Sequence, residues 1–315
     1  MSKVDAVVFG AAGFIGSNLT NSLVNDGLEV LAIDVHEPTD EFRNNAWFSA
    51  AKREIVDLRF EKPYLSGATQ AYNLAADMGG VGYFHKHDFW PYLNNSKITF
   101  NVLESCIEQK VSKLFMASSA CVYPIESQQD YLKVPLLNES QIETGFPDQM
   151  YGREKLMLLR LSERAPIDCR VGIYHGIYGI GQETEGERMK FPTSIATKML
   201  SAKNSGMVEI WGNGKQSRSF QWIDDAVTKT KSIMQGDNVG PVNIGFQGAK
   251  SIIEVAQICA SILDIKPQYT FTDDKPTGVI ARDCDNSKYW NHFEKFEETD
   301  YTRGFTTLIN WLQSK

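Results

Sequence analysis

The chain contains 315 residues, of which 42% are hydrophobic and 23% charged, and its formal net charge is −7 at pH 7. This composition is typical of a soluble globular protein with a substantial core, and the acidic balance argues against a nucleic-acid-binding surface. No apolar run approaches the length of a membrane-spanning helix and no leader-like segment opens the sequence, so we expect a cytoplasmic protein without membrane contact.

The first predicted element is an apolar strand over residues 4–9, which leads directly into a glycine-rich turn over residues 10–16 and then a helical pattern. The turn has the spacing GxxGxxG, which allows a pyrophosphate to approach the backbone closely at the helix N-terminus. The strand before it and the helix after it are the context that makes this motif informative. The predicted dinucleotide-binding residues here are Gly10, Gly13, Phe14, Ile15 and Gly16.

The second predicted strand, over residues 30–33, ends in Asp34. A carboxylate at this place can accept hydrogen bonds from the adenosine ribose, and it repels the 2′-phosphate of NADP. We therefore predict that the cofactor is NAD.

A third strand is predicted over residues 54–57 and a fourth over residues 71–74. The end of the third strand is expected to touch the adenine, and the small residues after the fourth let a cofactor lie close to the backbone. The residues expected to do so are Asp57, Leu58, Leu74, Ala75 and Ala76.

A helix is predicted over residues 94–108, where Cys106 has the spacing of a core residue. The other cysteines are widely spaced without a CxxC pair, and the histidines lack metal-ligand spacing, so no disulfide and no metal site is predicted. The alternation of strands and helices predicts an α/β fold of the Rossmann type, a doubly wound parallel sheet, with a smaller C-terminal substrate-binding lobe.

A set of proton-transfer residues is predicted around the strand over residues 113–117, which runs into Ser119 and Cys121. Tyr151 and Lys155 are four residues apart, so they lie on one face of a predicted helix. A lysine ammonium and a cationic nicotinamide both favour the phenolate of a tyrosine, which could then accept a proton while a hydride leaves the same carbon. Ser119 would hold the substrate oxygen.

Together, the glycine turn, Asp34, Ser119, Tyr151 and Lys155 resemble the extended short-chain dehydrogenase/reductase family over almost the whole chain. The stretches that most closely resemble its GDP-mannose 3,5-epimerase subfamily are residues 75–80, 118–124 and 211–220. The resemblance implies tightly held NAD and a nucleotide-sugar substrate, most specifically a GDP-linked one.

The resemblance further implies that Cys121 and Lys190 form an acid/base pair. Once a C4 hydroxyl has been oxidised to a ketone, the protons at C3 and C5 become acidic, so one group can remove a proton while the other delivers one to the opposite face. We expect nearby cations to lower the pKa of Cys121 and partial burial to lower that of Lys190. The residues implied to grip the sugar or diphosphate are Gly80, Lys198, Gln216, Arg218 and Arg282.

Several related functions remain open. A 4,6-dehydratase is disfavoured because Ala120 and Cys121 stand where it needs carboxyl groups. A nucleotide-sugar 4-epimerase would leave Cys121 unexplained, and a GDP-4-keto-sugar 3,5-epimerase/4-reductase pairs its cysteine with a histidine and consumes NADPH, whereas this chain has Lys190 and Asp34. A non-catalytic NAD-binding protein of this fold would typically lack the tyrosine or the lysine.

The resemblance is incomplete in the substrate-binding half. Gly176 stands where the subfamily usually has an asparagine, and the loop over residues 180–188 differs as well, which leaves the identity of the sugar open.

The resemblance also implies an assembly. In this family the helices that correspond to residues 94–108 and 151–164 commonly pair two subunits, so we expect a homodimer. The expected division is an NAD-binding domain over residues 1–172 and 221–247, and a nucleotide-sugar-binding lobe over residues 173–220 and 248–315.

Overall fold

The computed structural model describes residues 3–37 and 51–315. At its centre is a seven-stranded parallel sheet with the strand order β12-β7-β5-β4-β1-β2-β3, which confirms the predicted doubly wound fold. The strands are β1 (Ala6–Phe9), β2 (Val30–Asp34), β3 (Lys52–Ile55), β4 (Gln70–Asn73), β5 (Lys113–Ser119), β7 (Asp168–Tyr174) and β12 (Val242–Ile244). The strand order reverses between β1 and β4, and ligands of such sheets bind at the carboxyl ends of the strands at this point.

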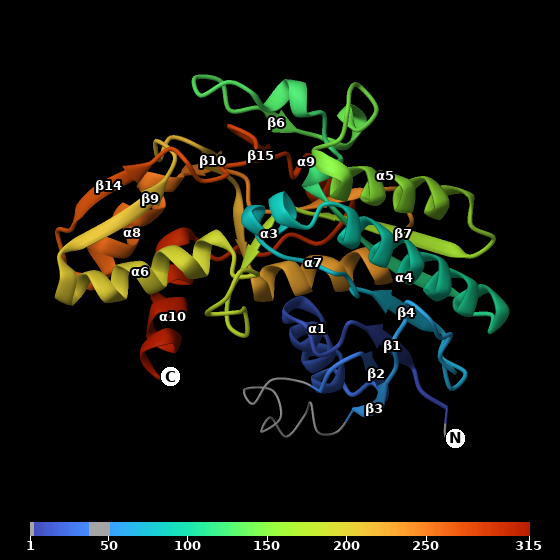
Figure 1. Ribbon diagram of the computed structural model, residues 1–315. Coiled ribbons are helices and arrows are strands. Elements are labelled where there is room, and N and C mark those ends of the chain that lie inside the picture. Colours follow the sequence, from blue (N-terminus) through green and yellow to red (C-terminus); the bar gives the residue numbers. More distant parts are fainter. Residues whose placement is uncertain (1–2, 38–50) are drawn as a thin grey trace.

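Two pairs of helices cover the two faces of this sheet (Figure 1). On one face α1 (Phe14–Asn25) packs against α7 (Ile223–Gln235), and on the other α4 (Phe89–Glu108) packs against α5 (Gln149–Arg164). The strands supply apolar side chains to both layers: in β1, Val8 belongs to the core on the α1 side and Val7 to the core on the α4 side. This alternation follows from the two-residue period of a strand that is buried on both faces.

A second group of elements lies to one side of the sheet (Figure 1), where three helices pack together beside a parallel pair of strands. These helices are α6 (Phe191–Ser205), α8 (Ile252–Leu263) and α10 (Tyr301–Gln313), and the strands are β9 (Met207–Trp211) and β14 (Gln268–Thr272). The shorter elements are α3 (Val81–Lys86), η2 (Ala120–Val122), η3 (Ile125–Gln128), β6 (Leu136–Leu137), η4 (Glu139–Gln141), β8 (Gly176–Tyr178), β10 (Ser217–Arg218), β11 (Phe220–Trp222), β13 (Lys250–Ser251), β15 (Asp283–Cys284) and α9 (Ser287–His292). Within the two described ranges, no helix has the length and apolar character that a membrane span requires.

Some element boundaries differ from the predicted ones. β3 runs over Lys52–Ile55 instead of 54–57, because Asp57 turns back to bind the backbone and side chain of Arg59. α4 begins five residues earlier than predicted, at Phe89, and holds a proline in its first turn, where the missing N–H needs no partner. The sequence pattern predicts a helix over residues 193–200, whereas α6 begins two residues earlier and ends at Ser205, where the C-cap Gly206 has a φ of 69° in the left-handed conformation.

Candidate active site

The turn between β1 and α1 lies against the end of β4. Gly10 has a φ of 78°, and a Cβ on it would lie 2.6 Å from the backbone nitrogen of Ala75. A Cβ on Gly16 would overlap the carbonyl oxygen of Gly10. Gly13 is the N-cap of α1, and no side chain among the described residues caps this helix. The backbone therefore forms a tight cradle at an uncapped helix N-terminus, which fits a dinucleotide pyrophosphate. Phe14 and Ile15 are the first residues of that helix.

Asp34 is fixed beside this cradle. Its Oδ2 accepts the N–H of Ala12 at 2.9 Å, and its Oδ1 accepts the N–H of Val35 at 2.7 Å. The carboxylate is thus held at the end of β2, next to the glycine turn, where a ribose hydroxyl can reach it and a 2′-phosphate is disfavoured.

Asp57 and Leu58, which were predicted to touch the adenine, have different surroundings in the structure. The pKa of Asp57 is lowered, chiefly by its hydrogen bond from Arg59, whose Nη2 lies 2.6 Å from Oδ2. Leu58 is buried in the core beneath α4, and its carbonyl accepts a hydrogen bond from Asn101 at 2.8 Å. The Leu58 side chain is therefore part of the core, and its backbone N–H is the group it can offer to a ligand. The half-buried residues that follow β4 are Leu74, Ala75 and Ala76.

At the carboxyl end of β5 the chain turns sharply. Ser119 is the last residue of the strand, and its Oγ accepts the N–H of Cys121 at 3.3 Å at the start of η2. Cys121 is half-buried and packs beside Tyr151. The serine hydroxyl and the cysteine thiol are thereby held close together by a single turn of the chain.

α5 brings the tyrosine and the lysine to this turn. Tyr151 is 6% exposed, its ring lies against that of Phe84 with centroids 4.6 Å apart, and Lys155 Nζ is 5.5 Å from the Tyr151 ring centroid. The Lys155 ammonium also lies 3.3 Å from a carboxylate oxygen of Glu154, which is fully buried. Lys155 is therefore paired with a buried carboxyl group of the same helix.

The surroundings of Tyr151 affect the pKa of its phenol in opposite directions. Burial raises the pKa of Tyr151 well above its usual range, negative charge on Cys121 and Glu154 adds to this effect, and a hydrogen bond with Ser119 opposes it. The phenol is thus protonated until a further positive charge comes close to it.

α5 is joined directly to the Cys121 turn. The carbonyl oxygen of Cys121 accepts the N–H of Asp148 at 2.8 Å, and a Cβ on Gly152 would overlap the same oxygen. Gln149, the first residue of the helix, has a φ of 59°, which is strained for a residue other than glycine. Glycine at position 152 therefore allows the helix that carries Tyr151 to contact the turn that carries Cys121.

Lys190 lies at the N-cap of α6 and is half-buried. Burial lowers its pKa, while attraction to negative charge on Cys121 and Glu183 opposes this effect. The segment before it lies on Gly80, where a Cβ would be 2.9 Å from the carbonyl oxygen of Met189. The structure thus brings the lysine, the cysteine and the glycine into one region.

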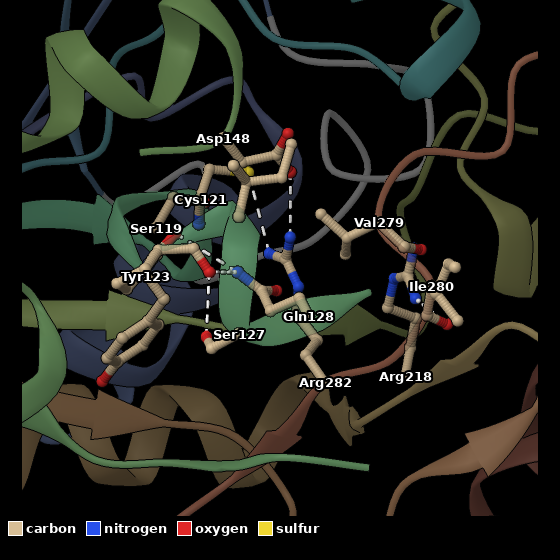
Figure 2. A network of polar contacts seen from close by, with 12 residues as sticks. Ser119, Cys121, Tyr123, Ser127, Gln128, Asp148, Arg218, Val279, Ile280 and Arg282 are labelled. Atoms are coloured by element: carbon tan, nitrogen blue, oxygen red, sulfur yellow. Dashed lines mark hydrogen bonds and ion pairs between the residues drawn. The ribbon is translucent and has the colours of Figure 1, made fainter. Parts of the chain in front are cut away.

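Two arginines lie beyond Cys121 (Figure 2). Arg282 is buried, with Nη2 2.9 Å from Asp148 and Nη1 3.8 Å from the Cys121 sulfur. Arg218 donates to backbone carbonyls, including that of Ile280 at 3.2 Å. Burial, together with repulsion by Arg282, lowers the pKa of Arg218, which shows that positive charge is concentrated here. Two neighbouring guanidinium groups, of which Arg282 is paired with Asp148 and Arg218 with backbone carbonyls, favour an anionic ligand.

The remaining predicted substrate residues are placed differently. Lys198 donates to the carbonyl of Glu209 at 2.9 Å and lies over the ring of Trp211. Gln216 is buried, and its Oε1 has no hydrogen-bond partner among the described residues. An unpaired buried acceptor is costly unless a ligand or water completes it, so Gln216 fits a binding role better than Lys198 does.

Gly176, the departure noted in the sequence, also has a structural explanation. A Cβ at this position would lie 2.7 Å from Phe220 Cδ1 and 2.7 Å from the carbonyl oxygen of Ser219. β8 and β11 are paired too closely here to admit the asparagine of the subfamily.

The NAD dependent epimerase/dehydratase family matches residues 6–245. The chain belongs to this family. The predicted relationship is therefore confirmed, and with it NAD as the cofactor, because the glycine cradle and Asp34 fit this group.

Curated relatives in this family include two plant enzymes. The chain is 34% identical over 296 residues to GDP-mannose 3,5-epimerase 1 of Oryza sativa subsp. japonica, covering 90% of this chain and 75% of that protein. It is 33% identical over 291 residues to GDP-mannose 3,5-epimerase of Arabidopsis thaliana, covering 89% of this chain and 74% of that protein.

Solved structures of the epimerase/dehydratase fold superpose on nearly the whole chain. UDP-glucose 4-epimerase from Thermotoga maritima matches with a TM-score of 0.86 at 20% identity, covering 98% of this chain and 99% of that chain. MoeE5 in complex with UDP-glucuronic acid and NAD matches with a TM-score of 0.81 at 26% identity, with the same coverage of both chains.

Two polar residues of this site were not predicted from the sequence. Asp148 stands where an N-cap acid is expected, just before α5, but its carboxylate binds Arg282 and does not cap the helix. Glu154, within the same helix, pairs with Lys155. The position before the helix was a usable signal for Asp148, whereas no spacing indicates that Glu154 is buried.

Proposed function

We propose that the protein is an NAD-dependent nucleotide-sugar epimerase of the GDP-mannose 3,5-epimerase type. The observation that carries the proposal is the placement of Cys121 and Lys190 in one region beside Ser119 and Tyr151. A 4-epimerase needs only the last two of these residues together with Lys155. The identity of about a third to plant GDP-mannose 3,5-epimerases supports the same choice.

In this reaction Ser119 holds the C4 hydroxyl of the sugar, and Tyr151 accepts its proton. The glycine cradle and Asp34 would hold NAD, which would supply reversible hydride exchange at C4 and a positive charge near the Tyr151 phenol. Lys155, which is paired with Glu154, lies over the ring of Tyr151 and helps to fix its orientation.

Cys121 and Lys190 then act on the 4-keto sugar. One removes the proton from C3 or C5, and the other delivers a proton to the opposite face of the same carbon. The lowered pKa of Lys190 increases the fraction of neutral amine available as a base near neutral pH. Arg218 and Arg282 supply positive charge for the diphosphate or the sugar oxygens.

The decisive experiment is proton NMR of the purified protein with GDP-mannose in D₂O without added NAD(H). We expect deuterium at C3 or C5 together with new sugar signals, and loss of both in Cys121→Ala. Cys169→Ala, which removes a buried thiol of β7 away from the site, is the matched control.

Other outcomes select other functions. Exchange that occurs only with oxidation of added NADPH favours the 3,5-epimerase/4-reductase, and inversion at C4 without deuterium uptake favours the 4-epimerase. A protein that holds NAD but turns over neither GDP- nor UDP-linked hexoses would contradict the proposal and favour a non-catalytic role.

We also propose a homodimer formed through α4 and α5, which lie side by side (Figure 1). α4 exposes three large apolar side chains, Phe89, Trp90 and Phe100. Association through this surface would cover them. A cytoplasmic location stays a prediction.

A further inference from the structure

The segment before Lys190 is held in place by an arginine that the proposed reaction does not use. We call residues 183–190 the strap. Arg188 Nη1 lies 2.9 Å from Asp77 Oδ1, and its Nη2 donates to the Tyr83 hydroxyl at 2.8 Å. The guanidinium carbon also lies 4.2 Å from the centre of the Tyr83 ring. One side chain of the strap thus contacts both the end of β4 and α3.

The carboxylate that receives Arg188 is itself rigidly held. Tyr83 donates its hydroxyl to Asp77 Oδ1 at 2.6 Å, and Asn94 donates to Oδ2 at 2.9 Å. The backbone N–H of Asp77 donates to Asn95 at 2.6 Å. Burial alone would raise the pKa of Asp77, but the hydrogen bonds from Tyr83, Asn94 and Arg188 outweigh it and lower the pKa. Asp77 is therefore an anionic anchor fastened to α4.

The strap has few other attachments. Gly181, just before it, and Gly186 within it have positive φ angles, so the backbone is locally permissive. Glu187 pairs with Lys86 at 3.5 Å and with His87 at 3.4 Å, but these groups are exposed, and such pairs contribute little. The attachment through Arg188 differs in that its partner Asp77 is only 15% exposed and that the same guanidinium also contacts Tyr83.

This attachment lies between the two halves of the active site. Arg188 is two residues before Lys190, and the strap backbone at Met189 lies on Gly80. On the other side, Tyr83 belongs to the same small apolar cluster as Tyr151. The contact therefore connects the proton-exchange lysine to the surroundings of the hydride-transfer tyrosine.

We propose that Arg188 and Asp77 are positioning residues that hold the strap so that Lys190 faces Cys121, and that proton exchange at the sugar depends on them while oxidation at C4 does not. The proposal rests on the role assigned to Lys190 above. Proton exchange at C3 or C5 would require a fixed position of Lys190, whereas a simple 4-epimerase reaction would not.

The first test compares Arg188→Gln and Asp77→Asn with the wild type. With GDP-mannose in D₂O, we expect deuterium incorporation to fall by about 10²-fold in both variants, since small misplacements of a reacting group have effects of this size. Formation of bound NADH and the KM should remain within about threefold. Lys86→Gln, which removes only the exposed pair with Glu187, should exchange like the wild type.

Two results would overturn the proposal. The first is unchanged exchange in both variants, and the second is an equal loss of NADH formation and exchange, which would indicate a general structural role. Thermal unfolding of each variant with NAD bound identifies a variant that does not fold, and Arg188→Lys, which keeps the charge but loses the planar contact, should recover part of the exchange.

A second measurement needs no substrate. Acetylation of Lys190 by acetic anhydride, followed by mass spectrometry across pH on the NAD-bound protein, reports the surroundings of its amine. Loss of the positive charge at position 188 would by itself raise the pKa of the Lys190 amine, and with it the midpoint pH of labelling. Loss of the negative charge at position 77 would by itself lower both. Release of the strap exposes the amine, so we expect the midpoint to rise in both variants.

Opposite shifts in the two variants would overturn the positioning role. A rise in both, with no exchange by the wild type on any nucleotide sugar, would leave the positioning role standing and reject the proposed function. The two ideas can therefore fail separately.

Discussion

Lys190 combines a cost in stability with the catalytic role proposed for it. Because burial lowers its pKa in the folded protein, the unfolded chain binds more protons between that lowered value and the ordinary lysine value. Stability therefore rises with pH across this window, and below it the folded protein pays for a buried ammonium.

This predicts the behaviour of Lys190→Met. At neutral pH the variant should be more stable than the wild type by about 0.5–2 kcal/mol, and the difference should vanish above the window. Deuterium exchange into the sugar should fall by about 10²-fold or more. Urea unfolding at several pH values measures the first effect. Lys203→Met removes an exposed charge from the same helix and should change neither property; destabilisation of Lys190→Met at every pH would contradict the prediction.

Single residues were predictable where a motif surrounds them. The glycine turn, Asp34 and the Tyr151 and Lys155 pair carry their own local context. Asp77 lies within the stretch 75–80, but its pairing with Arg188 could not be predicted, because the contact joins segments separated by 111 positions and depends on how the strap is placed. The sequence shows which residues are present, but not which of them are paired.

At the scale of elements, one buried ion pair links α7 to the C-terminal segment. Lys229 is fully buried, its Nζ lies 2.7 Å from Glu298, and it donates to the carbonyl of Gly245 at 2.8 Å. The rings of Tyr289 and Trp290 lie about it at 5.1 and 4.9 Å. The lysine thus joins a helix of the sheet layer to segments far along the chain.

We expect Lys229→Met to destabilise the protein by about 3–5 kcal/mol, because it leaves the largely buried carboxylate of Glu298 without a cation, with only the amide of Gln221 still donating to it. The double variant Lys229→Met with Glu298→Gln should recover part of this loss, since no unpaired charge remains. Urea denaturation of the three proteins measures the effect. Equal stability of the single variant and the wild type would show that the pair is not important.

Element types were more predictable than element boundaries. The apolar strands and the helix after the glycine turn follow directly from periodicity. The true end of α6 depends on Gly206, and the true start of α4 on a proline tolerated in the first turn, so both lie outside the apolar pattern that was used to place them. The 3-10 turn after β5 was not predicted, yet it sets the separation of Ser119 and Cys121.

At the scale of the whole molecule, the proposed homodimer can be tested by a single charge. Phe100→Glu places a carboxylate on the exposed face of α4 and should shift the protein from dimer to monomer mass in light scattering at micromolar concentration. Phe271→Glu, at an exposed position of β14, is the matched control and should remain dimeric. A wild type of monomer mass would reject the dimer. The division into an NAD-binding domain and a lobe likewise stays a prediction.

The contact between Gly152 and the carbonyl of Cys121 has a consequence for the history of such proteins. Tyr151 and Cys121 belong to one packed unit, since the helix that carries Tyr151 contacts the turn that carries Cys121. Lys190 belongs to a separate segment that attaches through side chains. New sugar specificities can therefore arise by rebuilding the strap and its surroundings, whereas the unit of turn and helix has to be inherited whole.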